Sequence, residues 1–437
     1  MEKKSNLYAM DFIDGDHLKS MQLDRMKKII RHAFNNVEFY RNRMRKFNLT
    51  PDSVKTLDDV EKLPFMVKQD LRDTYPFGLL AVPQSEVVRL HASSGTTGKP
   101  IVVAYTKEDL KVWTEVVHRA MANCGLSNSD IVQVSYGYGL FTGGLGAHYG
   151  AEDLGATVVP TSGGNTRRQI MLMRDFGVNA ICCTPSYFIH LIDEAAKTGI
   201  DMRELPIRAG IFGAEPWTAG MRKYVEENAG IEAFDIYGLS EIIGPGVAIE
   251  CPCHDGLHIY EDHFYPEIID PDTGKVLPDG EYGELVLTTL SKYAMPMIRY
   301  RTRDLTRIIP GRCACGRTIR RIDRISSRSD DMFIIRGVNV FPSQIEAALL
   351  NVAGTTPNYM ITLTNERGMD NVAVEVELSQ EKFNELGDNQ ESFRRQVSAM
   401  VESVTGIRVA ITLQAPGTLP RSEGKAKRVI DNRAGKI

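Results

Sequence analysis

The sequence predicts an α/β protein with a large N-terminal domain, which has a largely parallel sheet and a β subdomain, and a small, mobile C-terminal α/β domain. In the first part, short apolar runs alternate with amphipathic helical stretches, which is typical of parallel strands joined by helices. After about residue 255, short strands lie between turn signals such as 270–274 and 278–280. A charged joint at 327–331 then precedes a second α/β stretch with a basic end.

Apolar spacing predicts the individual elements. The first helix is expected over 16–37, where apolar side chains recur at helical spacing between charged ones. A second helix is expected over Lys107–Asn123, with Thr106 as its N-cap. The expected parallel strands are 131–135, 156–160, 180–184 and 209–213, separated by helices over 166–176, 186–197 and 218–228. Because ligands of parallel sheets gather at the carboxyl ends of the strands, residues that follow these strands could share one crevice.

The region after 255 completes the expected organisation. One strand of the β subdomain is expected over Gly283–Thr289. The C-terminal unit is expected to contain strands over 332–335, 358–364, 371–378 and 409–414 and helices over 343–351 and 393–405. A mobile, basic tail over 421–428 follows. We therefore expect two domains, 1–329 and 330–437.

Length, charge and cysteine content exclude several classes of protein. A chain of 437 residues exceeds a single core, and its net charge of −4 leaves no basic excess for a nucleic-acid backbone. The N-terminus has no apolar segment typical of a signal peptide, and the apolar runs are too short to span a membrane. We therefore expect a cytoplasmic protein with no nucleic-acid or membrane partner. The 7 cysteines then indicate free thiols or metal ligands rather than a disulfide framework.

A glycine-rich loop lies between an expected strand and a helix. It reads Ser93, Ser94, Gly95, Thr96, Thr97, Gly98, Lys99 and Pro100. Glycines let backbone N–H groups turn toward an anion, and the hydroxyls and the lysine add donors and charge, which suits a polyphosphate. The loop is not a Walker A motif, because Ser93 stands where that motif has glycine and Pro100 where it has a hydroxyl for Mg²⁺. A flexible Gly/Thr turn is the alternative.

Two further motifs combine aromatic and acidic side chains. In Tyr237–Glu241, the ring offers a stacking face for a base and Glu241 offers an oxygen ligand for Mg²⁺. The alternative is a helix N-terminus capped by Ser240. In Tyr300–Asp304, the carboxylate of Asp304, expected after a strand, can take both hydroxyls of a ribose. The alternative is a surface ion pair with a neighbouring arginine.

The last two signals lie near the C-terminus. The charged joint Ser327–Asp331 separates the strand-and-turn region before it from the α/β stretch after it, which is typical of a hinge. It is followed by an apolar strand and by Gly337–Pro342. Lys425 lies in a charge-rich loop close to the end of the chain. Such a lysine is normally solvated, so by itself it indicates no function.

Taken in order, these five signals resemble the motifs of the adenylate-forming enzymes, the superfamily of acyl-CoA synthetases and nonribosomal-peptide adenylation domains. The resemblance is closest to the phenylacetate–coenzyme A ligases and spans nearly the whole chain. It rests on Ser93–Pro100, Tyr237–Glu241, Tyr300–Asp304, Arg328–Pro342 and Pro420–Arg428. It implies a ligase that uses ATP to convert a carboxylate to an acyl adenylate and then forms a thioester with coenzyme A. Related ligases also imply a homodimer.

The resemblance implies roles for particular residues. Those implied to bind ATP are Ser93, Ser94, Gly95, Thr96, Thr97, Gly98, Lys99, Gly213, Ala214, Glu215, Pro216, Asp235, Tyr237, Gly238, Asp304 and Arg328. Glu241 would bind Mg²⁺, and Lys425 would neutralise charge during adenylation. Asp330 would be the hinge, and Gly337 would meet the pantetheine arm of coenzyme A.

Two positions depart from the pattern of the superfamily. Arg303 replaces the glycine that is usual there, although arginine fits the phenylacetate branch. The segment 419–425 is shorter and more polar than the common form, which leaves Lys427 as an alternative to Lys425. Lys425 is preferred because it follows Gly424.

A run of alternating rings and glycines at 136–144 suits a flat substrate. Glycines leave room for a ring, and aromatic side chains line that room. The residues implied to face the aryl group are Tyr136, Tyr138, Gly139, Phe141 and Gly143. We therefore expect an arylacetate, with phenylacetate first and indoleacetate open. A glycine-rich packing corner is the alternative.

Two short cysteine clusters indicate a metal site. The candidate ligands are Cys251, Cys253, His254, His258, Cys313 and Cys315. Two turn-borne pairs can close a tetrahedral Zn²⁺ site, but the candidates exceed four, and composition alone allows four cysteines. The resemblance implies the set Cys251, His258, Cys313 and Cys315, with Cys253 as the rival. Four protein ligands leave no open position, so this zinc would be structural. Unpaired surface thiols are the alternative.

Two other functions stay open. The chain could be an adenylating enzyme that loads the phosphopantetheine arm of a carrier protein, although no carrier domain follows Lys425. It could also be a non-catalytic nucleotide-binding or scaffold protein, against which the presence of Glu241, Asp304 and Lys425 argues. The expected partners are therefore an aryl carboxylate, ATP and coenzyme A.

Overall fold

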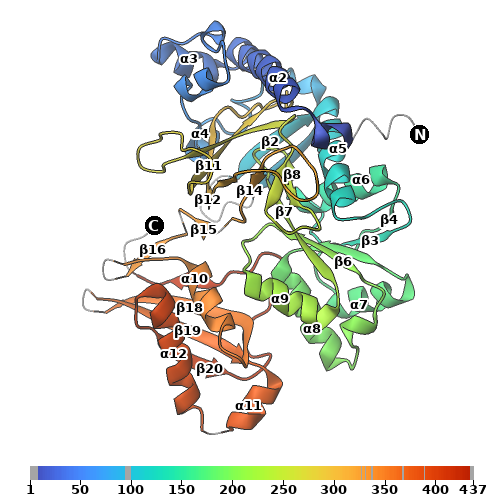
Figure 1. The fold of residues 1–437 in the computed structure, drawn as a ribbon, viewed down its shortest axis with the longest axis vertical. Coiled ribbons are helices and arrows are strands. Elements are labelled where there is room, and N and C mark those ends of the chain that lie inside the picture. The colour runs from blue at the N-terminus through green and yellow to red at the C-terminus, as the bar shows by residue number, and fades with distance from the viewer. Residues whose placement is uncertain are drawn as a thin grey trace.

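The computed structural model describes residues 8–93, 100–325, 327–329, 331–335, 338–366, 369–387 and 389–433. The chain forms an elongated molecule, with the N-terminal helices at one end and the last α/β unit at the other (Figure 1). No helix within these ranges is both long enough and apolar enough to cross a lipid bilayer.

The centre of the molecule is a 9-stranded sheet in the order β13-β14-β9-β8-β7-β6-β5-β3-β4. Its parallel part consists of β3 (Ile131–Val134), β4 (Thr157–Val159), β5 (Ala180–Cys183), β6 (Ala209–Gly213) and β7 (Glu232–Leu239). Its antiparallel part consists of β8 (Gly244–Glu250), β9 (Leu257–Ile259), β13 (Ile308–Ile309) and β14 (Arg321–Ile322). The four strands predicted from apolar runs are thus confirmed as neighbours in one parallel sheet.

Helices cover both faces of the parallel strands. One layer consists of α5 (Lys107–Asn123) and α6 (Gly143–Leu154), and the other of α7 (Thr166–Asp175), α8 (Pro185–Lys197) and α9 (Ala219–Ala229). Successive residues of β5 alternate between them: Cys182 packs with the first layer and Cys183 with the second. Close packing of α5 on α6 requires glycine, because a Cβ at Gly150 would lie 2.3 Å from a methyl group of Val117. The confirmed class is therefore α/β.

The N-terminal region caps one end of the sheet. It contains short 3-10 turns at Tyr8–Phe12, Pro51–Ser53, Asp58–Lys62 and Gln84–Glu86, the helices α2 (Gly15–Asn36), α3 (Glu38–Lys46) and α4 (Lys68–Asp73), and the hairpin of β1 (Val87–Ser93) and β2 (Ile101–Thr106). The predicted cap of α5 is confirmed, because the Thr106 hydroxyl accepts from the Asp109 amide over 3.1 Å. The Asp109 carboxylate in turn accepts from the Thr106 amide over 2.8 Å.

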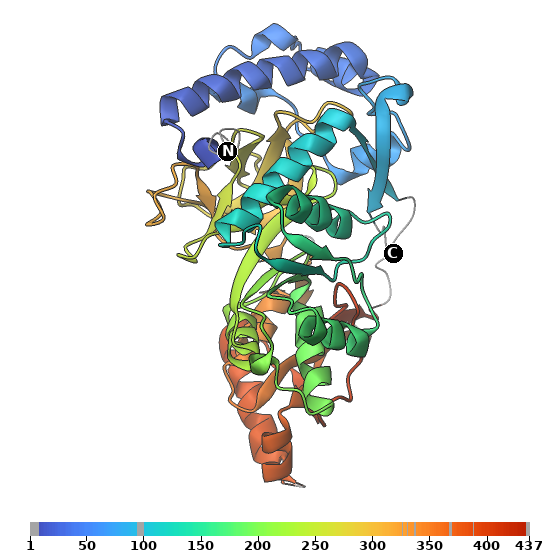
Figure 2. The same ribbon diagram turned by 90° about the vertical axis from the view of Figure 1, so that its right-hand side faces the viewer.

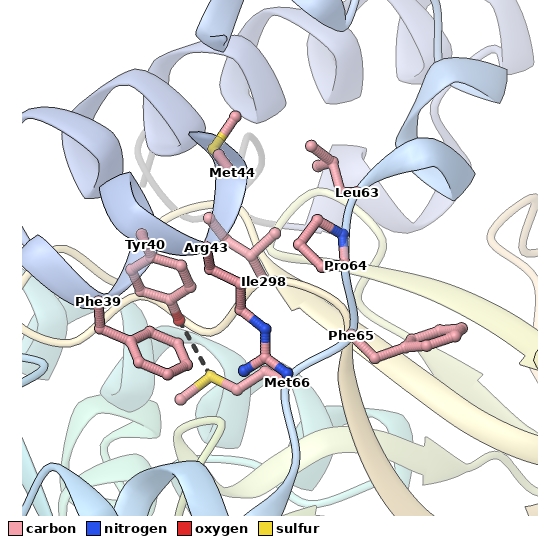
Figure 3. A pocket seen from close by; sticks show the side chains of 9 residues that line it. All are labelled: Phe39, Tyr40, Arg43, Met44, Leu63, Pro64, Phe65, Met66 and Ile298. Atoms are coloured by element: carbon pink, nitrogen blue, oxygen red, sulfur yellow. Dashed lines mark hydrogen bonds between the residues drawn. The ribbon is translucent and has the colours of Figure 1, made fainter. Parts of the chain in front are cut away.

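A small cavity lies where α3 meets the segment 63–66 (Figure 3). Its volume is about 10 Å³, which is room for one water molecule at most. The Tyr40 side chain lines one side of the cavity. Its hydroxyl donates to the carbonyl of Pro296 over 2.6 Å and lies close to the sulfur of Met66. This cavity is a packing feature, and it is too small for a substrate.

Two further units complete the chain. The predicted β subdomain is an antiparallel sheet of β10 (Phe264–Ile269), β11 (Gly283–Thr289), β12 (Tyr300–Thr306) and β15 (Ser327–Arg328). The C-terminal unit contains β16 (Phe333–Ile335), β17 (Val338–Val340), β18 (Thr355–Glu366), β19 (Met369–Leu378), β20 (Ala410–Gln414), β21 (Val429–Asp431), α10 (Pro342–Leu350), α11 (Gln380–Leu386) and α12 (Glu391–Thr405). Its buried apolar residues form a cluster of their own, from Phe333 to Ile411. It lies beside α8 and α9, at the far end from the N-terminal helices (Figures 1 and 2).

Candidate active site

The candidate site lies where parallel strands of the central sheet end. Tyr136 follows β3, Thr184 follows β5, and Gly213 ends β6, so these residues share one edge of the sheet. The end of β1 reaches the chain near this edge, because the amide of Ala92 donates to the carbonyl of Leu140 over 2.9 Å.

Ser93 is the described end of the predicted phosphate loop. It ends β1, and its buried hydroxyl has no partner among the described residues. The remaining loop residues Ser94, Gly95, Thr96, Thr97, Gly98 and Lys99, the predicted hinge Asp330 and the predicted coenzyme A contact Gly337 lie outside the described residues.

The segment that follows β6 runs along the same edge. A Cβ at Gly213 would lie 2.3 Å from the carbonyl oxygen of Ile236 on β7, so only glycine fits there. Ala214 follows with a φ of 71°. Both Ala214 and Pro216 are exposed. The predicted adenine-side residues therefore offer backbone and small side chains to a ligand at this edge.

Glu215 links two distant parts of the chain. Its carboxylate accepts one hydrogen bond from the amide of Ser186, at the start of α8, over 2.8 Å. It accepts another from the amide of Ala426 in the C-terminal tail over 2.9 Å. Sequence reasoning assigned Glu215 to the adenine side and missed this connection.

Tyr237, Asp304 and Arg328 form a connected group. The Tyr237 hydroxyl donates to Asp304 Oδ2 over 2.6 Å, and Arg328 Nη1 lies 3.5 Å from Asp304 Oδ1. Asp304 and Arg328 are cross-strand partners on β12 and β15. Burial, together with the charge of Asp304, raises the pKa of Tyr237 well above its usual value, so the hydroxyl stays a hydrogen-bond donor.

Three sequence-based interpretations of these motifs are wrong. Residues Tyr237 to Leu239 belong to β7, and the chain turns from them into β8, so the motif is not a helix N-terminus. Asp304 lies within β12 rather than after a strand. Asp304 is buried rather than at the surface, and the ion pairs seen for its neighbours Arg301 and Arg303 are with Glu284, at 2.6 and 3.5 Å. Glycine is required at 238, because a Cβ there would lie 2.1 Å from the carbonyl oxygen of residue 244.

Glu241 lies in the buried turn between β7 and β8, surrounded by donors and cations. The Tyr300 hydroxyl donates to its carboxylate over 3.4 Å, and the Lys68 ammonium lies 3.8 Å from the same oxygen. The fully buried Lys292 donates to the backbone carbonyl of Glu241 over 2.9 Å and lies 5.1 Å from the ring centre of Tyr105. Lys292 thus holds the backbone of the turn, while the Glu241 carboxylate faces the second cation, Lys68.

Asp235 faces a cation across the sheet. The Arg324 Nε lies 3.5 Å from Asp235 Oδ2, and its guanidinium lies 4.8 Å from the ring centre of Trp217. Burial raises the pKa of Asp235 to about 6, against the opposing charge of Arg324. Burial and the Arg324 charge thus act on the pKa of Asp235 in opposite directions.

The predicted aryl segment brings three of its residues together. A Cβ at Gly143 would lie 3.0 Å from the ring of Phe141 and 3.2 Å from the buried ring of Tyr136. Tyr138 is half-buried, and its hydroxyl makes a hydrogen bond of 3.1 Å to a histidine of α6. Gly139 has a φ of 154°, and Phe141 is 42% exposed. This segment therefore combines a buried ring, an open ring and glycines at the end of β3.

The C-terminal tail lies against the same edge of the sheet. The carbonyl of Gly424 accepts hydrogen bonds from the hydroxyls of Thr184 and Ser186 over 3.1 and 3.2 Å. Lys425 follows, with an exposed ammonium that makes no ion pair within the described ranges. Lys427 is exposed as well. The tail, expected to be mobile, is packed in this structure.

The predicted metal ligands gather in one place. Cys251, His258, Cys313 and Cys315 place one ligand atom each within 4.8 Å of the others. The sulfurs of Cys251 and Cys313 are 3.7 Å apart, and the Cys315 sulfur is 3.4 Å from His258 Nε2. A tetrahedral Zn²⁺ with Zn–S bonds of about 2.3 Å separates two sulfur ligands by about 3.8 Å. The rival Cys253 is exposed and lies outside this group.

Sequence reasoning missed four charged residues of this region: Lys68, Lys292, Arg324 and Arg421. Lys292 carried a weak signal, because it stands directly before the largely apolar stretch 293–298. Nothing in the local sequence of the other three distinguishes them from surface cations. Their partners lie far away in the chain, so only the tertiary structure reveals the contacts.

Comparisons with known proteins confirm the resemblance seen in the motifs. The family description "AMP-binding enzyme" matches residues 27–291, and "AMP-binding enzyme C-terminal domain" matches residues 337–433. The chain is 54% identical to a phenylacetate-coenzyme A ligase of Pseudomonas putida, over 98% of this chain and 97% of that protein. It is 50% identical to a phenylacetate-coenzyme A ligase of Escherichia coli (strain K12), over 99% of both chains.

A solved structure with similar domain arrangement is 2-hydroxyisobutyryl-CoA ligase in its postadenylation state, in complex with R3-HIB-AMP. It is 30% identical and superimposes with a TM-score of 0.92, over 97% of this chain and 91% of that chain. The same enzyme in its thioesterification state, with coenzyme A, has a TM-score of 0.72 over 97% of this chain and 92% of that chain. The domain arrangement here therefore matches the postadenylation state more fully.

Replacing Lys292 with methionine removes a buried ammonium. Burial lowers the pKa of Lys292 to about 8, against the opposing charges of Asp109 and Glu241. Between that value and the usual pKa of 10.5, the unfolded chain holds more protons at this residue than the folded chain, so stability rises with pH. We expect the free energy of unfolding of the native protein, relative to Lys292→Met, to rise by roughly 2–3 kcal/mol over this range.

Denaturant titrations at about pH 7.5 and about pH 10 measure this difference. Lys111→Met is the matched control, because the Lys111 side chain is 62% exposed and pairs only with Glu108 on its own helix among the described residues. A pH dependence that is the same for the Lys292→Met variant and the native protein would contradict the buried, proton-releasing lysine.

Proposed function

This chain belongs to the AMP-binding enzymes and, within them, to the phenylacetate-coenzyme A ligases, and from this premise we propose that it activates an arylacetate with ATP and transfers the acyl group to coenzyme A. The observation that supports the proposal is that the Lys425 tail contacts Thr184 and Glu215, which follow β5 and β6, while Glu241 follows the neighbouring parallel strand β7 and Asp304 pairs with Tyr237 of that strand. Phenylacetate is the leading substrate, and indoleacetate is the alternative within the same class.

The proposed reaction has two balanced steps. The substrate carboxylate attacks the α-phosphorus of ATP, the bond to the β-phosphate breaks, and acyl-AMP and pyrophosphate form. The thiol of coenzyme A, losing its proton, then attacks the acyl carbon, and the bond to AMP breaks to give the thioester. Both steps demand mainly positioning and charge stabilisation from the protein, because two anions must approach one another in the first.

The residues at the sheet edge suit the first step. Ser93 and the loop that follows would hold the outer phosphates, and Gly213 to Pro216 with Asp235 and Tyr237 would surround the adenine. Asp304 already accepts hydrogen bonds from a neighbouring hydroxyl, and it would exchange such donors for those of a ribose, assisted by Arg328. Lys425 is free to approach the α-phosphate, because its ammonium has no carboxylate partner in the described part of the chain.

A magnesium ion fits the surroundings of Glu241. The Glu241 carboxylate is buried, and its neighbours, the Tyr300 hydroxyl at 3.4 Å and the Lys68 ammonium at 3.8 Å, make only long contacts with it. It therefore offers the oxygen ligands that Mg²⁺ prefers. When bound, Mg²⁺ would offset negative charge on the phosphates. Lys68, beside the same carboxylate, adds a second positive charge at this place.

A structural zinc ion fits the cluster of Cys251, His258, Cys313 and Cys315. The sulfur–sulfur and sulfur–nitrogen distances of 3.7 and 3.4 Å match the edges of a tetrahedral site. Burial lowers the pKa of His258 to about 4, which leaves the imidazole neutral, the form that binds metal. This ion would join the segment after β8 to the loop before β14.

The two domains 1–329 and 330–437 and a hinge at Asp330 are part of this proposal. The separate apolar cluster from Phe333 to Ile411 supports a C-terminal body that moves as a unit. A related ligase has been solved in more than one state, and this chain matches its postadenylation state at a TM-score of 0.92 and its thioesterification state at 0.72. In the second arrangement a thiol could reach the place that Lys425 occupies here, with the region of Gly337 beside the pantetheine arm. We also expect a cytoplasmic homodimer.

The substrate and the acceptor can be tested together. With ATP and Mg²⁺, we expect phenylacetate to cause pyrophosphate release, and a thioester to form only when free coenzyme A is added. A panel of arylacetic, benzoic and fatty acids, followed by mass spectrometry of the thioester, defines the ring. Release of pyrophosphate without any thioester would favour loading of a carrier protein, and absence of both would favour a non-catalytic nucleotide-binding protein.

Replacing Lys425 with alanine separates the two steps. We expect the rate of adenylation to fall by about 10²–10³-fold, because a cation beside the developing charge is lost. Thioester formation from supplied phenylacetyl-adenylate should stay close to that of the native enzyme. Lys427→Ala, which removes the neighbouring exposed lysine, is the control and the test of the alternative assignment. An equal loss of both steps in Lys425→Ala would contradict the assignment of Lys425 to adenylation.

Metal analysis tests the zinc ion. We expect about one zinc per chain, lost in the variant with Cys313→Ser and Cys315→Ser, together with a lower unfolding temperature. Cys253→Ser should keep both the zinc and the stability, because Cys253 lies outside the cluster. A native protein that is folded but contains no metal would contradict the zinc site, without bearing on the proposed ligase activity.

A further inference from the structure

Arg421 joins the C-terminal unit to the body of the molecule. Its Nε and Nη2 donate to Asp193 Oδ2 on α8 over 3.1 and 2.9 Å. Its Nη1 and Nη2 donate to the two oxygens of Glu377 on β19 over 2.9 and 2.6 Å. All three side chains are at most 16% exposed. One guanidinium therefore bridges two carboxylates that belong to different parts of the fold.

The two halves of this bridge differ in what they connect. Glu377 also accepts hydrogen bonds from the amides of Gly417 and Leu419, over 3.1 and 2.6 Å, so it fixes Arg421 within the C-terminal unit itself. Asp193 belongs to α8 and is reached from the C-terminal unit by Arg421 and by Asn358 Nδ2, the latter over 3.3 Å. When the C-terminal unit turns, the pair with Glu377 can persist, whereas the pair with Asp193 must break.

Two further contacts hold the tail beyond Arg421 against the same edge of the sheet. The Gly424 carbonyl accepts from Thr184 and Ser186, and the Ala426 amide donates to Glu215. Lys425 lies between these two contacts. The Asp193–Arg421 ion pair holds the tail at its start, four residues before Lys425. The pair thus limits where the backbone of Lys425 can lie.

Breaking the pair leaves Asp193 in a place where burial disfavours its charge. Burial raises the pKa of Asp193, and Arg421 is the main charge that opposes this shift. Departure of the tail would also open this side of α8 to water, which then takes over the solvation of the carboxylate. The pair therefore favours the arrangement seen here without making it irreversible.

We infer that Asp193 is a positioning residue that, through Arg421, holds the tail and Lys425 in place for the first half-reaction and releases them for the second. The inference rests on the proposed function for the meaning of the two half-reactions. Asp193 touches no substrate: it acts on the equilibrium between two domain arrangements, and a contact made in only one of them shifts that equilibrium.

The test compares Asp193→Asn with Glu194→Gln in the full-length protein. Asparagine keeps the size of Asp193 but loses the charge that pairs with Arg421. Glu194 is the adjacent residue of the same helix, and its partners Arg167 and Lys197, at 2.7 and 3.6 Å, lie in the same body of the molecule. Both variants lose one carboxylate from α8, but only the first loses a contact with the C-terminal unit.

We expect Asp193→Asn to lower single-turnover pyrophosphate release by about tenfold, the factor typical of a lost charge-assisted hydrogen bond. Thioester formation from supplied phenylacetyl-adenylate and coenzyme A should be unchanged or faster. Asp193→Glu should recover part of the first step, and Glu194→Gln should match the native enzyme in both. An equal loss in both half-reactions, or no loss in the first, would overturn the inference.

Hydrogen exchange supplies a readout that does not depend on turnover. The Ala426 amide donates to Glu215 in this arrangement, so peptides covering 421–428 should exchange faster in Asp193→Asn than in Glu194→Gln. Unchanged exchange in Asp193→Asn would overturn the inference even in a protein with no ligase activity. If the tail exchanges faster in Asp193→Asn but the native protein never releases pyrophosphate, the role of Asp193 in holding the tail stands and the proposed function is refuted.

Discussion

Two backbone groups of the C-terminal tail, the carbonyl of Gly424 and the amide of Ala426, hold Lys425 at the carboxyl edge of the central sheet. The place of the lysine beside the other site residues depends on this contact. It joins the last part of the chain to helix α8 and to the turn after β6, which the parallel topology has already brought to one place. Because backbone groups make it, the contact specifies the position of the tail rather than the identity of its side chains, and the lysine stays free for chemistry.

Two carboxylates of the candidate site, Glu241 and Asp304, have both a cation and a hydroxyl donor beside them. Glu241 has a lysine at 3.8 Å and a tyrosine hydroxyl at 3.4 Å, both too distant for strong hydrogen bonds. Asp304 has a close hydroxyl at 2.6 Å and a guanidinium at 3.5 Å. Carboxylates held in this way can accept new partners from a bound nucleotide. The buried Lys292 donates to the backbone carbonyl of Glu241 and thereby restricts how the turn between β7 and β8 can move.

Much of the fold could be predicted from the sequence, because its strands are short apolar runs between clear helical patterns. The strand over 180–183 and the helix over 107–123 were predicted within a residue of their observed bounds, and Thr106 caps that helix as its hydroxyl allows. The clustering of Cys251, His258, Cys313 and Cys315 was predicted only with the help of the family resemblance, since the spacing allowed Cys253 as well.

What could not be predicted depends on contacts between distant segments. The motif at Tyr237 resembles a helix start because glycine, serine and glutamate follow the aromatic residue, yet pairing with β8 keeps it in a strand. Asp304 was expected after a strand, but it lies within β12, where it is the cross-strand partner of Arg328 on β15. The roles of Lys68, Arg324 and Arg421 are likewise set by residues far from them in the sequence, where local propensity carries no information.

The most direct test of the moving tail is to lock the two bodies together. A Cβ at Gly220 on α9 would lie 3.0 Å from the Cβ of Leu350 on α10, so after a small shift the pair Gly220→Cys and Leu350→Cys can form a disulfide across the interface. With ATP, Mg²⁺, phenylacetate and coenzyme A, the oxidised variant should release one pyrophosphate per chain and form no thioester until it is reduced. Thioester formation at the native rate by the oxidised variant would contradict the account.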